Sequence, residues 1–362
     1  MARITMQSVA DRAGVSKTAV SLAFNDPGRL AEGTVKRILA LAGELGYVPD
    51  AAARALRTSR TSSLGLLLPQ QLDVVLSNPY HTEFLMGVGN VCHQEGYTLL
   101  LVPPVRGSML RAIPSASVDG FIVSGMDEDR GEIQTLRQRE VPFVLVDSCG
   151  AAGAATVLSD DATGMEELVT HVLELGHRRI TLVRLMAGED ENYQYWRSVD
   201  SARMRGAVAA LGKFGMGVED VDIAEAYCTR QSGIRVFGEI WDAEQRPTAI
   251  VAFSDIIALG ILDSARERGV RVPEDVTVTG FDDIAEAGWS APPLTTVRQP
   301  IATKGRLAAE YLVESLREHR EHGVNRHQLP VTLEVRGSSG PPRKNGSAAR
   351  NLKPHQRSLA GA

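Results

Sequence analysis

Apolar residues recur at helical spacing through the first 45 residues of the chain. Two short helices are predicted within residues 5–25, joined at Gly14. Their shared apolar positions are Val9, Ala10, Ala13, Val15, Val20 and Ala23. A third amphipathic helix is predicted over residues 34–45, followed by Gly46 as its stop. Its apolar positions are Val35, Ile38, Leu39, Ala42 and Leu45.

The spacing of the first two helices is that of a helix-turn-helix module, although three small amphipathic helices also occur in structural bundles. Ser16 stands where an N-cap hydroxyl would begin the second helix. The outer face of that helix and the residues just beyond it would meet DNA, with Arg29 on a phosphate rather than a base. The residues predicted to contact DNA from this region are Ser16, Lys17, Thr18, Ser21, Leu22, Asn25 and Arg29.

From Ser63 onward, short β-rich runs alternate with helical patterns. Parallel strands are predicted in SLGLLLP, YTLLLVP, GFIVSG and PFVLVD, with helices over residues 83–94, 133–139 and 164–174. A second set follows, with strands in HRRITLVRL, TAIVAFS and VTVTGFDD and helices over residues 202–214, 233–241 and 256–268. The fold class is therefore α/β: an all-α helix-turn-helix head precedes a two-lobed, doubly wound body with a ligand cleft at the carboxyl ends of its strands.

Charge divides the chain in the same way. Residues 1–62 carry nine Lys and Arg against five Asp and Glu, a net charge of +4, whereas residues 63–337 carry 25 against 39, a net charge of −14. A basic head attracts phosphates, whereas an acidic body is repelled by them. Residues 338–362 contain five basic and no acidic residues and are predicted to form a disordered tail.

Several classes of site are not indicated. Cys92, Cys149 and Cys228 are widely separated and lack CxxC or Cys/His spacing, which argues against disulfides and a metal site. GVGNVC is an incomplete GxGxxG, and the phosphate-loop, GxSxG and HExxH patterns are missing, so no catalytic residue or cofactor is predicted. A cytoplasmic protein without membrane contact is expected, because neither a signal segment nor an apolar run of membrane-spanning length is present.

The segments SVADRAGVSKTAVSLAFN and LAEGTVKRILALAGELGYVPDAAARALRTSRTSSLGLLLP resemble the lactose/galactose-repressor (LacI-type) family of bacterial transcription regulators. The resemblance continues to about Arg336 and implies a periplasmic-binding-protein-like sensor over residues 63–337. By that resemblance, the chain crosses between the lobes near residues 296–300. Residues 301–323 then complete the first lobe, and residues 329–336 return to the second.

The resemblance also implies the function. A homodimer, most often a repressor, would bind a pseudo-palindromic operator with residues 1–49 and respond to a small-molecule effector. Residues 50–62 would form a hinge helix and linker, with Leu56 wedged into the minor groove and Arg54 on a phosphate. Taken alone, this segment is interpreted more simply as an alanine-rich linker helix. A nucleotide- or sugar-dependent enzyme is the alternative class, and a transport-type binding protein is opposed by the DNA-reading head.

The effector site implied by the family pattern consists of Tyr80, His81, Ser124, Arg203, Asp255 and Asp282. Acids, a guanidinium group and aromatic faces suit a polyhydroxylated ligand, which favours a sugar or sugar derivative. Three departures from the pattern weaken a finer assignment. The segment LMAGEDENYQYWRSVD replaces the short glycine-rich loop that is common after its strand. Ser254 replaces an asparagine that usually precedes the cleft aspartate, and Cys228 stands where many members place a stacking aromatic.

Each residue of this set also has a structural interpretation. The two aspartates follow strands, where acids often cap loops or helices. His81 would equally suit a solvated helix start, and Arg203 could pair with Asp200 at the surface. Tyr193, Tyr195 and Trp196 form either a cluster at the lobe edge or a platform over the ligand.

Overall fold

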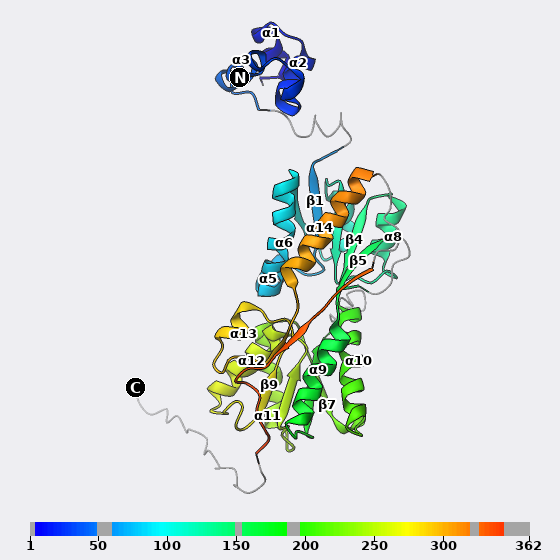
Figure 1. Cartoon of the computed structure of the whole chain (residues 1–362), viewed down its shortest axis with the longest axis vertical. Coiled ribbons are helices and arrows are strands. Elements are labelled where there is room, and N and C mark those ends of the chain that lie inside the picture. Colours follow the sequence, from blue (N-terminus) through cyan, green and yellow to red (C-terminus); the bar gives the residue numbers. More distant parts are fainter. Residues whose placement is uncertain (1–3, 49–59, 149–153, 187–195, 319–325, 344–362) are drawn as a thin grey trace, which may run out of the picture. The chain divides into compact units, whose positions relative to one another are not determined.

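The computed structural model describes residues 4–48, 60–148, 154–186, 196–318 and 326–343 (Figure 1). The chain divides into two compact units, Met1–Ser63 with Ser117–Asp119, and Leu64–Ala116 with Gly120–Ala362. We call the described residues 4–48 the head and the second unit the body. Five residues named above lie outside the described residues: Arg54, Leu56, Cys149, Tyr193 and Tyr195.

The head contains the three predicted helices. They are α1 (Met6–Ala13), α2 (Lys17–Asn25) and α3 (Glu32–Leu45), with the short 3-10 turn η1 (Pro27–Arg29) before α3. Gly14 and Gly46 end α1 and α3 in the left-handed conformation, with φ of 64° and 67°, which suits a residue without Cβ. The Ser16 side chain accepts a hydrogen bond from the backbone N–H of Ala19, as an N-cap does.

The core of the head consists of small apolar side chains and one isoleucine: Val9, Ala10, Ala13, Val20, Ala23, Ile38 and Ala42. One predicted core position is wrong, because Leu39 is 41% exposed. Leu41 packs against the core instead, on the same side of α3 as Ile38 and Leu45. The turn of 100° per residue carries Leu39 just past the edge of the apolar stripe.

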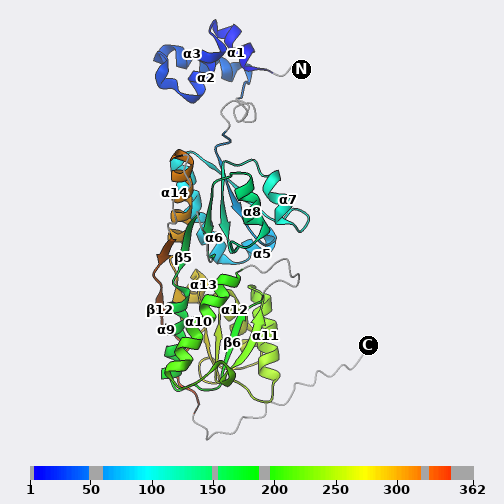
Figure 2. The same ribbon diagram turned by 90° about the vertical axis from the view of Figure 1, so that its right-hand side faces the viewer.

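The first lobe of the body is built on a six-stranded sheet with strand order β11-β5-β4-β3-β1-β2. The strands are β1 (Ser63–Leu67), β2 (Thr98–Val102), β3 (Gly120–Ser124), β4 (Phe143–Val146), β5 (Ala155–Ser159) and β11 (Arg326–Leu329). The helices are α5 (Leu72–Leu76), α6 (Pro79–Glu95), α7 (Met109–Ser115), α8 (Gly131–Gln138) and α14 (Ile301–Glu318). Helices α6 and α14 pack together, and Figure 2 shows α7 and α8 on the other side of the sheet from α14.

The second lobe has a four-stranded sheet with order β7-β6-β8-β9. Its strands are β6 (Ile180–Leu185), β7 (Asp222–Ala226), β8 (Ala249–Ala252) and β9 (Thr277–Thr279). Its helices are α9 (Asp161–Glu174), α10 (Arg197–Lys213), α11 (Arg230–Asp242), α12 (Asp255–Glu267) and α13 (Ala285–Trp289), with a 3-10 turn at Val218–Asp220. Helix α9 packs on α10, and α11 packs on α12.

In both sheets the order of the strands reverses between the first strand and the third. Strand β1 pairs in parallel with β3, and β6 pairs in parallel with β8, so the third strand of each winding order lies beside the first. Loops at the carboxyl ends of such strand pairs diverge and leave a crevice. The predicted two-lobed, doubly wound architecture is confirmed, and it points the strand ends of both lobes toward the segment that joins them.

The crossing predicted near residues 296–300 is present as β10 (Thr296–Arg298), which pairs antiparallel with β12 (Thr332–Glu334). Three details differ from the prediction. Leu329 belongs to β11 of the first lobe, so the return to the second lobe starts later. The helix predicted over residues 164–174 belongs to the second lobe. Some short elements were not predicted, namely strands β5, β7 and β11 and helices α5, α7 and α13. Strand β7, in DIAEA, is mostly exposed and therefore has no apolar run.

The predicted tail begins too early in the chain. Ser338 is fully buried, and its side chain accepts from the Thr295 N–H at 2.8 Å and donates to the Val278 carbonyl. Gly340 exchanges two hydrogen bonds with Thr277. Because glycine, serine and proline carry no apolar pattern, this hydrogen-bonded attachment leaves no signal in the sequence. Residues 344–362 lie outside the described part of the chain.

Candidate functional site

A pocket lies between the two lobes at the carboxyl ends of their strands. The space inside it that can hold the centre of a water-sized molecule is about 40 Å³, so the pocket is narrow as the lobes stand in this structure. It is lined by Gln70, Asn78, Tyr80, His81, Asp147, Leu185, Trp196, Val199, Arg203, Cys228, Ser254 and Asp282. Four of the six predicted effector residues are therefore brought together here. Ser124 and Asp255 are not among the lining residues.

On the first-lobe side of the pocket, a buried lysine holds a carboxylate. Lys304 of α14 is 1% exposed, and its Nζ donates to Asp147 Oδ1 at 2.7 Å and Oδ2 at 3.0 Å. Tyr80 of α6 donates its hydroxyl to Asp147 Oδ2 at 2.8 Å. Burial, followed by the negative charge of Asp147, raises the pKa of Tyr80 well above its usual value, so the phenol stays protonated.

On the second-lobe side, Arg203 of α10 donates hydrogen bonds to three partners. Its Nε donates to Asp161 Oδ1 at 2.8 Å, one Nη donates to Asp282 Oδ1 at 3.4 Å, and the other donates to the Phe253 carbonyl oxygen. The guanidinium carbon also lies 3.8 Å from the centre of the Phe281 ring. Burial opposes the charge, but the two aspartates outweigh it and raise the pKa of Arg203.

The surface pairing of Arg203 with Asp200 is not formed. Asp200 instead accepts from the Arg184 guanidinium and from the Leu185 N–H. Asp161, at the start of α9, is a partner of Arg203 that the sequence did not reveal. Burial raises the pKa of Asp161, while Arg203 opposes that shift.

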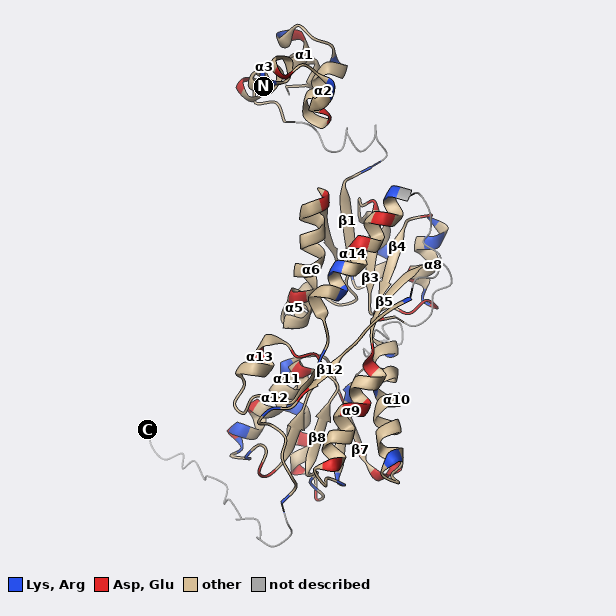
Figure 3. Ribbon diagram, in the orientation of Figure 1, with Lys and Arg blue, Asp and Glu red and all other residues tan. Residues whose placement is uncertain are grey.

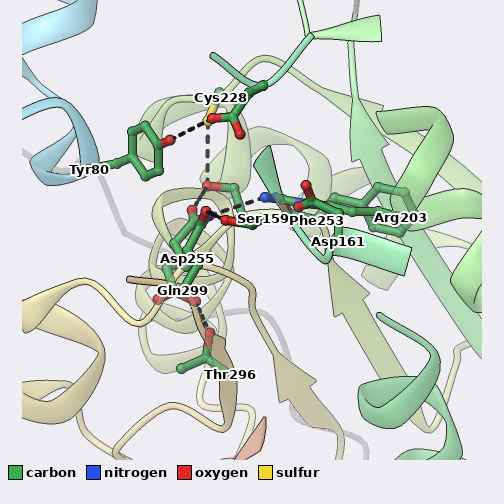
Figure 4. Close-up of polar contacts among 12 residues, drawn as sticks. Tyr80, Ser159, Asp161, Arg203, Cys228, Phe253, Asp255, Thr296 and Gln299 are labelled. Atoms are coloured by element: carbon green, nitrogen blue, oxygen red, sulfur yellow. Dashed lines mark hydrogen bonds and ion pairs between the residues drawn. The ribbon is translucent and has the colours of Figure 1, made fainter. Parts of the chain in front are cut away.

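The two predicted aspartates have different surroundings. Asp282 lines the pocket and accepts from Ser254 Oγ at 2.7 Å and from Gln299 Nε2 at 2.6 Å. Asp255 is fully buried behind the wall and accepts from Thr296 Oγ1 at 2.5 Å and from the Ile284 N–H at 3.0 Å (Figure 4). Burial raises the pKa of both carboxyls. Of the two interpretations offered for Asp255, the structure matches the structural one, in which the acid ties together a strand end and a loop.

Gln299 joins the two polar clusters. Its side-chain oxygen accepts from Lys304 at 2.6 Å and from Ser159 at 2.9 Å, and its side-chain nitrogen donates to Asp282. The hydrogen bonds therefore run without a break from Lys304 in the first lobe to Asp282 in the second. Such a connected network makes the relative position of the lobes depend on a few buried contacts.

Three aromatic rings form another wall of the pocket. The ring centres of Tyr80 and His81 lie 5.3 Å apart, and the Trp196 ring lies 6.5 Å and 5.9 Å from them. Burial lowers the pKa of His81 to about 4, so the imidazole is neutral at physiological pH. Cys228 lines the pocket and donates to Ser254 Oγ at 3.4 Å, and burial raises the pKa of its thiol to about 11.

The head presents the second candidate surface. Ser16, Lys17, Thr18, Asn25 and Arg29 are exposed, and Leu22 is half-buried. The prediction that Ser21 lies on the outer face of α2 is wrong. Its side chain is buried, and Asn25 donates both to the Ser21 carbonyl and to its hydroxyl. Ser21 follows the fully buried Val20 at 100° around α2, so it lies at the edge of the buried face.

The described residues form neither a membrane-spanning helix nor a cluster of side chains that would hold a metal ion. Helices of those residues are all too short or too polar to span a membrane. In the same part of the chain, His, Cys, Asp and Glu side chains nowhere gather into a group of three that would hold a metal ion.

Comparison with known proteins places this arrangement in a family. Residues 5–50 match the model of the bacterial regulatory proteins of the lacI family, and residues 169–339 match that of a periplasmic binding protein-like domain. A curated relative, the HTH-type transcriptional regulator Rv3575c of Mycobacterium tuberculosis, is 35% identical over 94% of this chain and 98% of its own length. The chain belongs to the LacI family. It is a DNA-binding transcriptional regulator.

Other relatives of this LacI-family regulator agree. The HTH-type transcriptional repressor PurR of Photobacterium profundum is 31% identical over 92% of this chain and 98% of its own. The solved complex of the transcriptional regulator CelR with cellobiose has a TM-score of 0.68 at 27% identity, covering 93% of this chain and all of that one. A lac repressor dimer bound to operator shares the fold, with a TM-score of 0.77 at 21% identity, covering 94% of this chain and all of that one.

Proposed function

We propose that this LacI-family regulator is a homodimeric repressor whose hold on a pseudo-palindromic operator is controlled by a sugar or sugar derivative in the inter-lobe pocket. The observation that carries the proposal is the pocket itself. Both lobes supply polar side chains to it, so a ligand there contacts the two lobes at once. The curated relatives include repressors, which supports repression rather than activation as the proposed effect on transcription.

The exposed face of α2 is proposed to read base edges in the major groove. Lys17 and Thr18 are exposed there, and Leu22 is half-buried beside them. Arg29 is proposed to meet a phosphate, which positions the head without specifying a sequence. Arg54 and Leu56 complete the proposed DNA contacts, and both lie outside the described residues.

The chemistry of the pocket favours an uncharged, hydroxyl-rich effector. Arg203 already has two carboxylate partners, so an anionic ligand would compete with buried acids for it. Asp282 lines the pocket, and its Oδ2 accepts a hydrogen bond from Ser254; a carboxylate oxygen can accept a second hydrogen bond, here from a ligand hydroxyl. The faces of Tyr80 and Trp196 suit the C–H face of a sugar ring. The cellobiose complex of the CelR regulator supports this class of ligand.

The effector is proposed to act by binding without turnover. A ligand shifts an equilibrium between two lobe arrangements only by its difference in affinity for them. Here the difference would come from the contacts that it makes with both lobes. The altered arrangement would change how the paired first lobes present their hinge segments, and thus the affinity for DNA.

The test uses the full-length chain and an operator fragment selected from a randomised DNA pool. Fluorescence anisotropy is measured with and without cellobiose, D-ribose and a wider panel of sugars. Lys17→Ala should weaken the selected operator by about 1–3 kcal/mol, as expected for one base contact. The control is Lys36→Ala on α3. It removes an exposed ion pair with Glu32 of the same helix and should leave the affinity for the operator unchanged.

The pocket is tested with His81→Ala rather than Arg203→Ala, because loss of Arg203 would leave Asp161 and Asp282 buried without their cation. His81→Ala should abolish the response to the active sugar and leave operator binding without sugar intact. The control His93→Ala changes an exposed residue on the same helix. An operator response that survives His81→Ala would remove the pocket from the effector site. Steady conversion of a sugar to a product would contradict the assignment of a binding protein.

A further inference from the structure

Three consecutive residues at the start of α10, in the second lobe, bond to the loop after β3, in the first lobe. The Trp196 N–H donates to the Gly125 carbonyl at 3.0 Å. The Arg197 guanidinium donates to Asp127 Oδ2 at 3.1 Å and to Asp129 Oδ2 at 2.7 Å, and the Ser198 hydroxyl donates to Asp127 Oδ1. We call these six residues, Gly125, Asp127, Asp129, Trp196, Arg197 and Ser198, the clasp.

The clasp places the Trp196 indole directly against the backbone of Gly125. A Cβ built on Gly125 would lie 2.9 Å from three atoms of the indole, so the ring lies on Gly125 where only glycine leaves room. Trp196 itself has a φ of 65°, a conformation that costs energy for a bulky residue and persists where surrounding contacts enforce it. Its neighbours Arg197 and Ser198 supply those contacts.

Trp196 is at the same time a wall of the effector pocket. It stands beside Tyr80 and His81, which belong to the first lobe, although Trp196 precedes a second-lobe helix. Trp196 therefore joins the lobes and forms one wall of the pocket. If the clasp opens, the indole loses its support and the pocket is uncovered on that side.

The clasp is made of parts that respond differently to salt. The Arg197 side chain is 50% exposed, and so is much of Asp129, so added salt screens their attraction. Ser198 and Asp127 are buried, and their hydrogen bond is shielded from solvent. Acidic and basic residues are interspersed along the helices of both lobes (Figure 3), but Arg197 joins two acids across the cleft itself.

We propose that the clasp holds Trp196 as a wall of the pocket and controls the entry of small polar solutes, with Arg197 as the residue that positions the indole. The proposal rests on the proposed function only in that the entering solute would be the effector. Clasp opening is then the step that precedes effector binding or release, and ionic strength sets how often it occurs.

The first readout is the accessibility of Trp196 in the full-length chain. Trp241→Phe and Trp289→Phe leave Trp196 as the single tryptophan, since the chain has three. Arg197→Ala should raise the acrylamide quenching constant of Trp196 by about twofold or more. Arg197→Lys should restore part of the protection, because an ammonium still meets a carboxylate. Raising salt to about 0.5 M should increase quenching in the parent and have little effect in Arg197→Ala.

The second readout is entry into the pocket. Cys228 lines the pocket, whereas Cys92 is buried elsewhere in the first lobe. Methyl methanethiosulfonate is applied, and modification of each cysteine is followed by peptide mass spectrometry. Arg197→Ala and high salt should each speed modification of Cys228 by about threefold or more, as expected from loss of a screened contact, without changing the rate at Cys92.

A matched control removes an ion pair made by the same helix within one lobe. Lys213→Ala breaks the contact between α10 and Glu166 of α9, and it should change neither readout. Unchanged quenching in Arg197→Ala would overturn the clasp, and increased quenching with an unchanged rate at Cys228 would overturn its control of entry. Neither readout requires operator DNA or an identified effector, so failure here is distinct from failure of the proposed function.

Discussion

The head and the body of this regulator bury different kinds of side chain. In the described part of the head, the buried positions are small apolar residues, one isoleucine and Ser21. The body buries Lys304, Arg203 and four aspartates around one pocket. The head therefore keeps its polar chemistry on an exposed face, where a side chain can change without disturbing the core. In the body, the groups that would bind a ligand also hold the lobes together.

This difference predicts how each region tolerates substitution. Exposed charges contribute little to stability, so a change on α2 should alter DNA binding alone. A buried charge that loses its partner is costly, so a change in the pocket should alter stability and ligand response together. The following predictions run from the largest expected effect to the smallest.

Lys304→Met should reduce the free energy of unfolding of the body by about 3–5 kcal/mol, because it leaves the buried Asp147 carboxylate without its cation. Adding Asp147→Asn should recover much of this loss, since the uncompensated charge is then gone. Urea unfolding followed by circular dichroism measures both. On the same helix, Arg306→Ala breaks an exposed pair with Glu310 and should cost less than about 0.5 kcal/mol. Equal losses for Lys304→Met and Arg306→Ala would contradict the contrast.

Lowering the pH should destabilise the body through His81. Burial lowers the pKa of this residue from 6.5 to about 4. Between these values the unfolded chain binds a proton that the folded chain does not, so stability is lost as pH falls through this window. The loss amounts to about 3 kcal/mol by pH 4.

The measurement is the difference in unfolding free energy between wild type and His81→Gln from pH 7.5 to 4. Burial raises the pKa of Asp161, Asp255 and Asp282, so these acids make the folded state more stable as the pH falls. Wild type and His81→Gln share these acids, so the difference between the two proteins isolates His81. His93→Gln is the control on the exposed part of the same helix. A difference that does not change with pH would show that His81 is not held neutral by burial.

Glycines inside helices should respond according to whether another helix packs against them, which occurs at Gly206 in the body. A Cβ on Gly206 of α10 would overlap the Ala162 carbonyl oxygen of α9, so Gly206→Ala should cost about 1–3 kcal/mol through overpacking. Gly212 on the same helix and Gly43 of α3 have no atom within 4 Å of such a Cβ. Alanine at either position should raise stability by about 0.5–1 kcal/mol through helix propensity. Thermal unfolding of the three variants compares them, and a stabilising Gly206→Ala would refute the close helix contact.

The head was predictable because its signals are local. Ser16, Gly14 and Gly46 are cap residues within one turn of the helices that they delimit, and the apolar stripe of α3 is continuous. The errors were at the edge of a stripe, where a rotation of a few tens of degrees decides exposure. Leu39 fell on the exposed side and Ser21 on the buried side for this reason.

In the body, the pocket was predicted through family resemblance and only in part. Tyr80, His81, Arg203 and Asp282 line it, whereas Asp147 and Lys304 were missed. Lys304 did leave a signal, because it lies on the same face of α14 as Ala308 and Leu312, four and eight residues later. A lysine in an apolar stripe predicts a buried cation, but the stripe does not name its partner.

The sequence by itself determined most of the longer helices, most of the strands and the family of this regulator, because caps, periodicity and motifs act between residues close in the chain. Only the tertiary structure decided which charges meet. Lys304 lies 157 residues from Asp147 and 224 from Tyr80 along the chain, and Gln299 joins the two lobes from the segment that crosses between them. Contacts at such separation leave no local pattern, since each side chain is compatible with many partners until the sheets bring one of them within hydrogen-bonding distance.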